Sequence, residues 1–151
     1  MENRPMTISK LLSANDTGES GSHQAGILVP RNPDILSFFP SLDRGTKNPR
    51  IVIDFIDESG APQRFTYIYY NNKFFDTHGT RNEYRLTGMT KYLRNLNAKS
   101  GDTLVFSRDD NGRYSISLQR AEATGVISTM KESGKRKVVL RPSNSWKIVE
   151  I

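Results

Sequence analysis

Apolar and polar side chains alternate with a period of two along much of the chain, and this pattern predicts short β-strands. In residues 51–56, for example, Ile51, Ile53 and Phe55 alternate with Val52, Asp54 and Ile56. The expected strands span residues 26–29, 51–56, 65–70, 104–106, 114–118, 138–140 and 146–149. Seven short strands separated by turn signals are typical of a small barrel or sandwich.

Turn residues between these strands predict three hairpins. Residues 58–62 (Glu-Ser-Gly-Ala-Pro) separate the second and third strands, and residues 142–144 (Pro-Ser-Asn) separate the last two. Asn111 and Gly112 lie between the strands at 104–106 and 114–118. Because Asn-Gly tolerates two successive positive φ angles, this pair predicts a type I′ turn.

Two short helices interrupt the strands. In the first, Asn32 is the expected N-cap, proline occupies the first turn, and Pro40 ends the helix. In the second, Thr87 is the expected cap, and an apolar stripe follows at helical spacing. The stripe consists of Met89, Tyr92, Leu93 and Leu96, and it leaves Lys91 and Arg94 on the opposite face.

The composition fits one globular domain spanning residues 1–151. The chain is 35% hydrophobic and 25% charged, with a mean hydropathy of −0.60. It contains no cysteine, which excludes disulfides, iron–sulfur clusters and thiolate zinc sites. No apolar run approaches the roughly 20 residues of a membrane helix, and the N-terminus lacks the apolar core of a secretory signal. We therefore expect a cytoplasmic protein with no membrane partner.

Positive charge is concentrated in the second part of the chain. The net charge is +6, but residues 1–60 carry 6 basic and 8 acidic side chains, whereas residues 61–151 carry 16 basic and 8 acidic ones. This asymmetry favours a face that binds a polyanion. A well-solvated basic surface would produce the same count.

The motifs of common enzymes are absent. No lysine has an acid two positions before it, as the usual metal-dependent nuclease core requires, and His23 and His78 are too few for a three-histidine zinc site. A Gly-x-Ser-x-Gly elbow and a Gly-Lys-Ser/Thr phosphate loop are also missing. We therefore expect no catalysis, no metal and no small-molecule substrate in this chain.

The segment Thr80-Arg-Asn-Glu-Tyr-Arg85 carries the clearest candidate chemistry. On an extended chain, Arg81, Glu83 and Arg85 share one face; we call these three residues the Arg-Glu-Arg comb. Arginine can donate two hydrogen bonds to guanine O6 and N7, and a carboxylate can accept one from cytosine N4. The comb therefore predicts readout of G·C pairs in a major groove. The alternative is a surface charge ladder in which Glu83 simply pairs with its neighbours.

A second polar segment, residues 13–24, contains one small apolar side chain in twelve residues. Its hydroxyl, amide and imidazole groups suit phosphates and base edges, so it could form a second contact arm around His23. A solvated turn histidine is the alternative.

Several motifs resemble known DNA-binding families. Residues 86–106, which run from Leu-Thr-Gly-Met to Gly-Asp-Thr-Leu-Val-Phe, resemble the plant B3 DNA-binding domains. Residues 13–18, 21–30, 39–40 and 80–85 together resemble the N-terminal effector domain of EcoRII-type restriction endonucleases. The resemblance covers residues 10–118 in the same order.

This resemblance implies a mainly β fold, a seven-stranded open pseudobarrel with two short helices, which grips double-stranded DNA between two arms. The N-arm would be residues 13–24 and the C-arm residues 80–85. The family's effector domain binds CCWGG sites without cutting them, while a separate nuclease domain, for which Mg²⁺ is expected, cleaves. The family's readers fall on the comb and His23. The chain departs from the family at Gly79, Tyr84 and Leu28, where a lysine, a basic residue and a tyrosine are usual.

We therefore expect a cofactor-free, monomeric DNA-recognition module of a bacterial-type restriction endonuclease. The expected base-reading residues are Arg81, Glu83, Arg85, Asn82 and His23. The expected arm and phosphate contacts are Ser13, Asn15, Asp16, Thr17, Ser22, Gln24, Lys73, Thr80, Tyr84, Lys91, Arg94 and Lys99. The basic segment 131–147 could extend the phosphate track, or it could be a solvated hairpin edge protected by lysines.

Three other functions remain open on sequence grounds. A stand-alone B3 module of the transcription-factor type would bind duplex DNA in the same way. A β module that binds protein or saccharide would keep the comb as a purely structural ladder. A binder of single strands or RNA could use Tyr67, Tyr69 and Tyr70 as stacking platforms.

Overall fold

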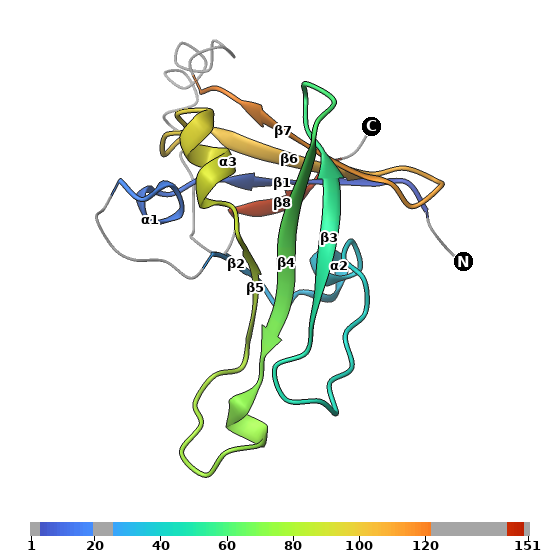
Figure 1. The fold of residues 1–151 in the computed structure, drawn as a ribbon, viewed down its shortest axis with the longest axis vertical. Coiled ribbons are helices and arrows are strands. Elements are labelled where there is room, and N and C mark those ends of the chain that lie inside the picture. The colour runs from blue at the N-terminus through green and yellow to red at the C-terminus, as the bar shows by residue number, and fades with distance from the viewer. Residues whose placement is uncertain (1–3, 20–25, 122–144, 150–151) are drawn as a thin grey trace, which may run out of the picture.

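The computed structural model describes residues 4–19, 26–121 and 145–149. These residues build a curled eight-stranded sheet with short helices at its margins (Figure 1). The strands are β1 Met6–Leu11, β2 Ile27–Val29, β3 Arg50–Ile56, β4 Pro62–Tyr70, β5 Glu83–Thr87, β6 Thr103–Arg108, β7 Tyr114–Gln119 and β8 Trp146–Ile148. The helices are α1 Ala14–Thr17, α2 Pro33–Leu36, the 3₁₀ turn η1 Asn72–Phe74 and α3 Thr90–Asn95.

The strand order β2-β5-β4-β3-β7-β6-β1-β8 brings the two edges of the sheet close together. The indole Nε1 of Trp146 in β8 donates a hydrogen bond to the carbonyl of Leu28 in β2 at 3.0 Å, so the edge strands meet through a side chain. All neighbours are antiparallel except β3 and β7, which pair over only Phe55 with Tyr114 and Ile56 with Ser115. A sheet that curls without a complete ladder is an open pseudobarrel, and the expected fold class is confirmed.

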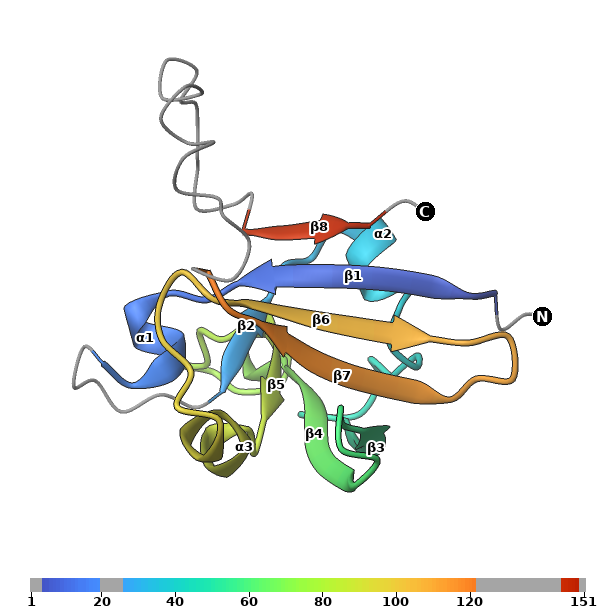
Figure 2. The ribbon, with the colours of Figure 1, turned by 90° about the horizontal axis from the view of Figure 1, so that it is seen from above.

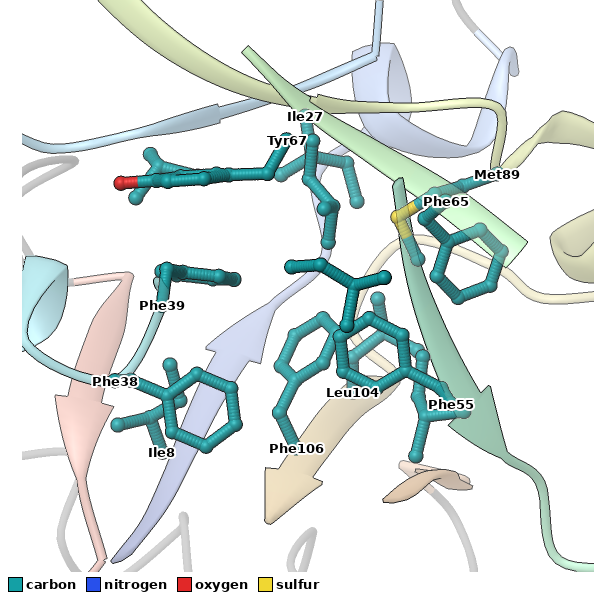
Figure 3. Close-up of a cluster of buried hydrophobic side chains, with 14 of the residues drawn as sticks. Ile8, Ile27, Phe38, Phe39, Phe55, Phe65, Tyr67, Met89, Leu104 and Phe106 are labelled. Atoms are coloured by element: carbon teal, nitrogen blue, oxygen red, sulfur yellow. The ribbon is translucent and has the colours of Figure 1, made fainter. Parts of the chain in front are cut away.

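Aromatic side chains fill the interior of the sheet (Figure 3). Phe55 of β3 lies near Phe65 and Phe106, with ring centroids 5.4 and 5.8 Å away. Phe39, which follows α2, stacks on Tyr67 at 4.5 Å. Each such ring contributes about 1.5–3 kcal/mol when fully buried, an upper estimate that makes this core a rigid support for the segments at its rim.

The sequence underestimates the number of strands. β1 and β5 were not expected as strands, whereas the strand expected at 138–140, its hairpin at 142–144 and most of the basic segment 131–147 lie outside the described residues. β1 lies between β6 and β8 (Figure 2) and buries Ser9 and Lys10, so its pattern is not amphipathic. The Lys10 Nζ is satisfied by Asp16 Oδ2 at 2.8 Å and by the Leu11 carbonyl at 3.1 Å.

The type I′ turn expected at Asn111 and Gly112 is wrong. Gly112 has a φ of 79°, but Asn111 is not among the described residues with positive φ. The Asp109 carboxylate accepts hydrogen bonds from the backbone N–H groups of Asn111 and Arg113 at 2.8 and 2.9 Å. This side-chain bridge stabilises a turn in which only the glycine adopts the left-handed conformation.

Both predicted helices are present, but the end of the first and the cap of the second differ from the prediction. Asn32 caps α2 as expected, but the α-helix ends at Leu36, well before Pro40. Thr87 is not a helix cap: it is the last residue of β5, and its hydroxyl donates to the Thr66 carbonyl at 3.3 Å. Gly88, with a φ of 83°, ends the strand, and α3 begins at Thr90.

Candidate nucleic-acid interface

The Arg-Glu-Arg comb lies on β5 and on the segment immediately before it. The Glu83 Oε2 atom accepts hydrogen bonds from Arg81 Nη2 at 2.8 Å and from Arg85 Nε at 2.6 Å. The side chains of Arg81, Glu83 and Arg85 are 37%, 28% and 19% exposed, so the comb is partly accessible to solvent. Burial acts to raise the pKa of Glu83, but the hydrogen bonds and positive charges of the two arginines outweigh it and hold the pKa below its usual value.

Both guanidinium groups are held from a second side. The Arg81 guanidinium carbon lies 3.7 Å from the centre of the Tyr70 ring, and Tyr70 is the register partner of Glu83 across β4 and β5. Arg85 Nη1 donates to the Gly26 carbonyl at 3.1 Å. Within the described residues, Arg81 Nε and Nη1 and Arg85 Nη2 donate to no protein acceptor, so both guanidinium groups keep N–H groups that can donate to a ligand.

The backbone of the C-arm is fixed by buried amides. The Asn72 Oδ1 atom accepts from the Arg81 N–H at 2.9 Å, and the Arg81 carbonyl accepts from the Lys73 N–H at 3.1 Å. Asn71 is fully buried: its Oδ1 accepts from the Asn48 N–H at 2.7 Å, and its Nδ2 donates to the Thr46 carbonyl at 3.0 Å. The loop before β3 therefore braces the arm.

Gly79 has no room for a side chain, because a Cβ atom there would lie 2.1 Å from the Asn72 carbonyl oxygen. The family's usual lysine does not fit at this position in this loop conformation. The other two departures have different surroundings. Leu28 is half-exposed and is the register partner of Arg85, whereas the ring of Tyr84 is buried.

Tyr84 and Asn82 lie apart from the comb's reading face. The Tyr84 ring stacks on Tyr69 with centroids 4.3 Å apart, and the Tyr69 hydroxyl donates to Asn82 Oδ1 at 2.6 Å. Burial raises the pKa of Tyr84. In this conformation, both predicted contact residues support the arm from the opposite side of the ribbon.

The N-arm begins with a well-capped helical turn. Ser13 and Asp16 form a capping box around α1: the Ser13 Oγ accepts from the Asp16 N–H at 3.2 Å, and Asp16 Oδ2 accepts from the Ser13 N–H at 2.9 Å. The Thr17 hydroxyl hydrogen-bonds to Glu19 at 2.9 Å. Asn15 is exposed, whereas Ser22, His23 and Gln24 lie outside the described residues. The root of this arm is therefore ordered by its own polar side chains.

Basic side chains flank both arms. Lys91 and Arg94 are exposed on α3, Lys99 is exposed in the turn that follows, and Thr80 and Lys73 are exposed in the C-arm loop. α1 and α3 contact each other and lie at the same end of β1 and β6 (Figure 2). Arg50 is an exposed residue that the sequence analysis missed. It is the register partner of Ile68, which pairs in turn with Arg85, so Arg50 lies in the same cross-strand row as the comb.

The described residues contain no group of three His, Cys, Asp or Glu side chains placed to hold a metal ion. Nor does this part of the chain contain a helix that is long and apolar enough to cross a membrane.

Comparison with known proteins identifies the family. Residues 3–120 match the family model described as restriction endonuclease EcoRII, N-terminal. The chain belongs to this family. Over 109 residues, the chain is 34% identical to the type II restriction enzyme EcoRII of Escherichia coli, covering 68% of the chain and 26% of that enzyme. It is 29% identical over 126 residues to auxin response factor 18 of Oryza sativa subsp. japonica, covering 83% of the chain and 16% of that protein. The chain thus spans only about a quarter or less of these relatives.

Two solved structures share the fold. One is the B3 domain of the UbaLAI restriction endonuclease with cognate DNA, with a TM-score of 0.56, 20% identity and coverage of 95% of this chain and 86% of that one. The other is the Arabidopsis FUS3–DNA complex, with a TM-score of 0.58, 21% identity and coverage of 75% and 95%. The chain therefore has the fold of a B3-like pseudobarrel.

Proposed function

We propose that this domain recognises double-stranded DNA sequence-specifically in the major groove, without catalysis of its own, as the recognition module of a larger restriction endonuclease. The observation that carries the proposal is the comb: two arginines held on the rim of the barrel by one carboxylate, with N–H groups left for a ligand. The two solved structures described above both contain DNA, which supports the same class of partner for this chain.

The ion pairs in the comb are compatible with base readout. Both arginines bind Oε2 of Glu83, and within the described residues Oε1 accepts no hydrogen bond. Oε1 is therefore the atom that would accept from cytosine N4, while the remaining N–H groups of Arg81 and Arg85 would donate to guanine O6 and N7. The ion pairs within the comb therefore do not prevent base readout, because each of its side chains keeps atoms that can bind a base edge. Adjacent G and C bases suit a CCWGG-type site.

Phosphate contacts would position the comb. Lys73, Lys91, Arg94 and Lys99 are exposed beside the two arms, and we add Arg50 from the cross-strand row of the comb. The polar residues of the N-arm, including His23, would grip the second side of the site. If about six phosphates are neutralised, log K falls with log salt concentration with a slope of about −5.

Selection from a randomised duplex library, followed by fluorescence anisotropy, tests the proposal. The domain should enrich one site, and Arg81→Ala should abolish preference for it while weak non-specific binding remains. Arg64→Ala is a matched control, because Arg64 is an exposed arginine on β4 that is paired with Asp54 at 2.9 Å, away from the comb. If no duplex is enriched, or if the two variants lose preference equally, the proposal is wrong.

A stand-alone B3 module of the transcription-factor type is the second candidate, and the match to the auxin response factor favours it. Such a module would bind duplex DNA with the same binding curve as the recognition module of a restriction endonuclease. Incubation of the full gene product with the selected site and Mg²⁺ separates the two, because only an attached nuclease domain would cleave. A single-strand binder is disfavoured, because Tyr67 and Tyr69 are buried and cannot stack on bases. We expect the isolated domain to be monomeric in sedimentation.

A further inference from the structure

Two adjacent phenylalanines are exposed in the loop that leads from β4 into the C-arm, at the turn of residues 72–75, which we call the tip. Phe74 is 61% exposed and Phe75 is 44% exposed, and they are the only aromatic side chains among the large exposed apolar residues that the structure describes. Nine other Phe and Tyr side chains in the described part of the chain are buried in the core. Two phenyl rings left in water therefore mark a contact surface more strongly than isolated aliphatic side chains do.

The tip that carries these rings is rigid. The Phe74 N–H donates to the Asn71 carbonyl at 3.0 Å, and the Phe75 N–H donates to the Asn72 carbonyl at 3.1 Å. Gly79 packs against Asn72 so closely that no side chain fits between them. The backbone that presents the rings is thus held by hydrogen bonds, so little backbone conformational entropy would be lost when they meet a ligand.

The tip is continuous with the comb. The Lys73 N–H, one residue before Phe74, donates to the Arg81 carbonyl at 3.1 Å. Figure 1 shows η1 at the far end of the β4–β5 ribbon, projecting from the body of the sheet. The charge of the tip also suits DNA: the Lys73 Nζ lies 5.8 Å from the centre of the Phe74 ring, and Asp76 is paired with Lys47 at 2.9 Å.

We propose that Phe74, flanked by Phe75, contacts the 5-methyl group of a thymine next to the G·C pair that Arg81 reads. The inference rests on the proposed function and adds an apolar element to its polar readout. The thymine methyl is the one apolar group that a base edge presents in the major groove, and phenylalanine is one of the side chains that contact it. Lys73 would bind the neighbouring phosphate and hold the ring against the base.

The test replaces each thymine of the library-selected duplex, one at a time, with deoxyuridine, which lacks only this methyl group. At one position beside a G·C pair, the substitution should weaken wild-type binding about fourfold, the equivalent of one buried methylene. Phe74→Ala should weaken binding to the thymine duplex by at least as much, and it should bind the thymine and deoxyuridine duplexes equally well.

Ile56→Ala is the matched control, because Ile56 is an exposed apolar residue at the opposite end of the β3–β4 ribbon. It should keep the wild-type preference for thymine, and equal melting temperatures would show that both variants are folded. The inference is overturned if no thymine is sensitive, or if Phe74→Ala retains the preference or weakens both duplexes while keeping their ratio. In these cases duplex binding by the wild type still stands, whereas failure of the wild type to bind any duplex overturns the proposed function as well.

Discussion

Replacing Glu83 with glutamine removes a negative charge from between two guanidiniums and keeps the size of the side chain. The hydrogen bonds at 2.8 Å from Arg81 and 2.6 Å from Arg85 would then run from a cation to a neutral amide oxygen, and the attraction between opposite charges would be lost. The contacts of Arg81 with Tyr70 and of Arg85 with the Gly26 carbonyl would remain. The change therefore tests whether the carboxylate organises the comb.

Two opposite effects on DNA binding follow. Loss of one negative charge near the phosphates should raise non-specific affinity by about 1 kcal/mol, or fivefold, at low salt. Loss of the acceptor for cytosine N4 should lower discrimination at that base pair by about 1–3 kcal/mol. Glu83→Gln should thus bind random DNA more tightly than wild type does and its selected site with less preference.

The same variant should be slightly less stable. A partly exposed ion pair contributes well below its Coulomb energy, so the free energy of unfolding should fall by about 1 kcal/mol. Because the folded-state pKa of Glu83 is lowered, this contribution is present above the ordinary value of 4.5 and is lost as the pH falls through the folded-state pKa. Urea unfolding at pH 7 and pH 3 should show a difference from wild type that shrinks at the lower pH.

Anisotropy titrations of selected and scrambled duplexes at several salt concentrations measure the binding effects. Asp54→Asn is the control, because it neutralises a carboxylate that pairs with Arg64 on the same ribbon. It should leave the preference for the selected site unchanged. An unchanged preference in Glu83→Gln would refute the role given to the carboxylate.

Four further variants test the comb and its support. Arg81→Ala and Arg85→Ala should each lose about 1–3 kcal/mol of discrimination at a guanine, measured by competition between substituted duplexes. Unchanged affinity of both variants for the selected site would contradict the assignment of these arginines as guanine readers. Tyr70→Leu removes the ring beneath the Arg81 guanidinium and should lower site preference about threefold at nearly constant melting temperature; a large fall in stability would instead indicate a packing role. Asn71→Ala leaves the Asn48 N–H without its partner and should cost about 1–3 kcal/mol in urea unfolding, whereas a neutral result would show that the loop is braced elsewhere.

The comb was predictable from sequence, because side chains two apart share a face on any extended segment. The contacts from Tyr70 and Asn72 that hold Arg81 in place were not predictable in this way. Tyr70 lies under Arg81 only because β4 and β5 pair in the register that places Tyr70 opposite Glu83. Asn72 reaches the Arg81 backbone only through the turn that Gly79 permits. These contacts depend on pairing and loop geometry, which leave no local periodicity.

β1 shows why one part of the fold escaped prediction. Ser9 and Lys10 are buried although both are polar, and the alternation that begins at Met6 breaks off at Lys10, so the strand lacks the pattern of a half-buried strand. Lys10 can be buried because Asp16, six residues later, supplies a carboxylate through the capping box of α1. Asp16 is a predicted DNA contact, and it thus also has a structural role as the partner of the buried Lys10.

The most direct test of major-groove readout by the comb is a scan with 7-deazaguanine, which removes the N7 acceptor and leaves Watson–Crick pairing intact. Each guanine of the selected duplex is replaced in turn, and competition against the parent duplex is measured for wild type, Arg81→Ala and Arg85→Ala. We expect 7-deazaguanine at specific positions to weaken wild-type binding about fivefold, and each of these positions to become insensitive in one of the two arginine variants. If wild type tolerates 7-deazaguanine at every position, the comb does not read guanine in the major groove.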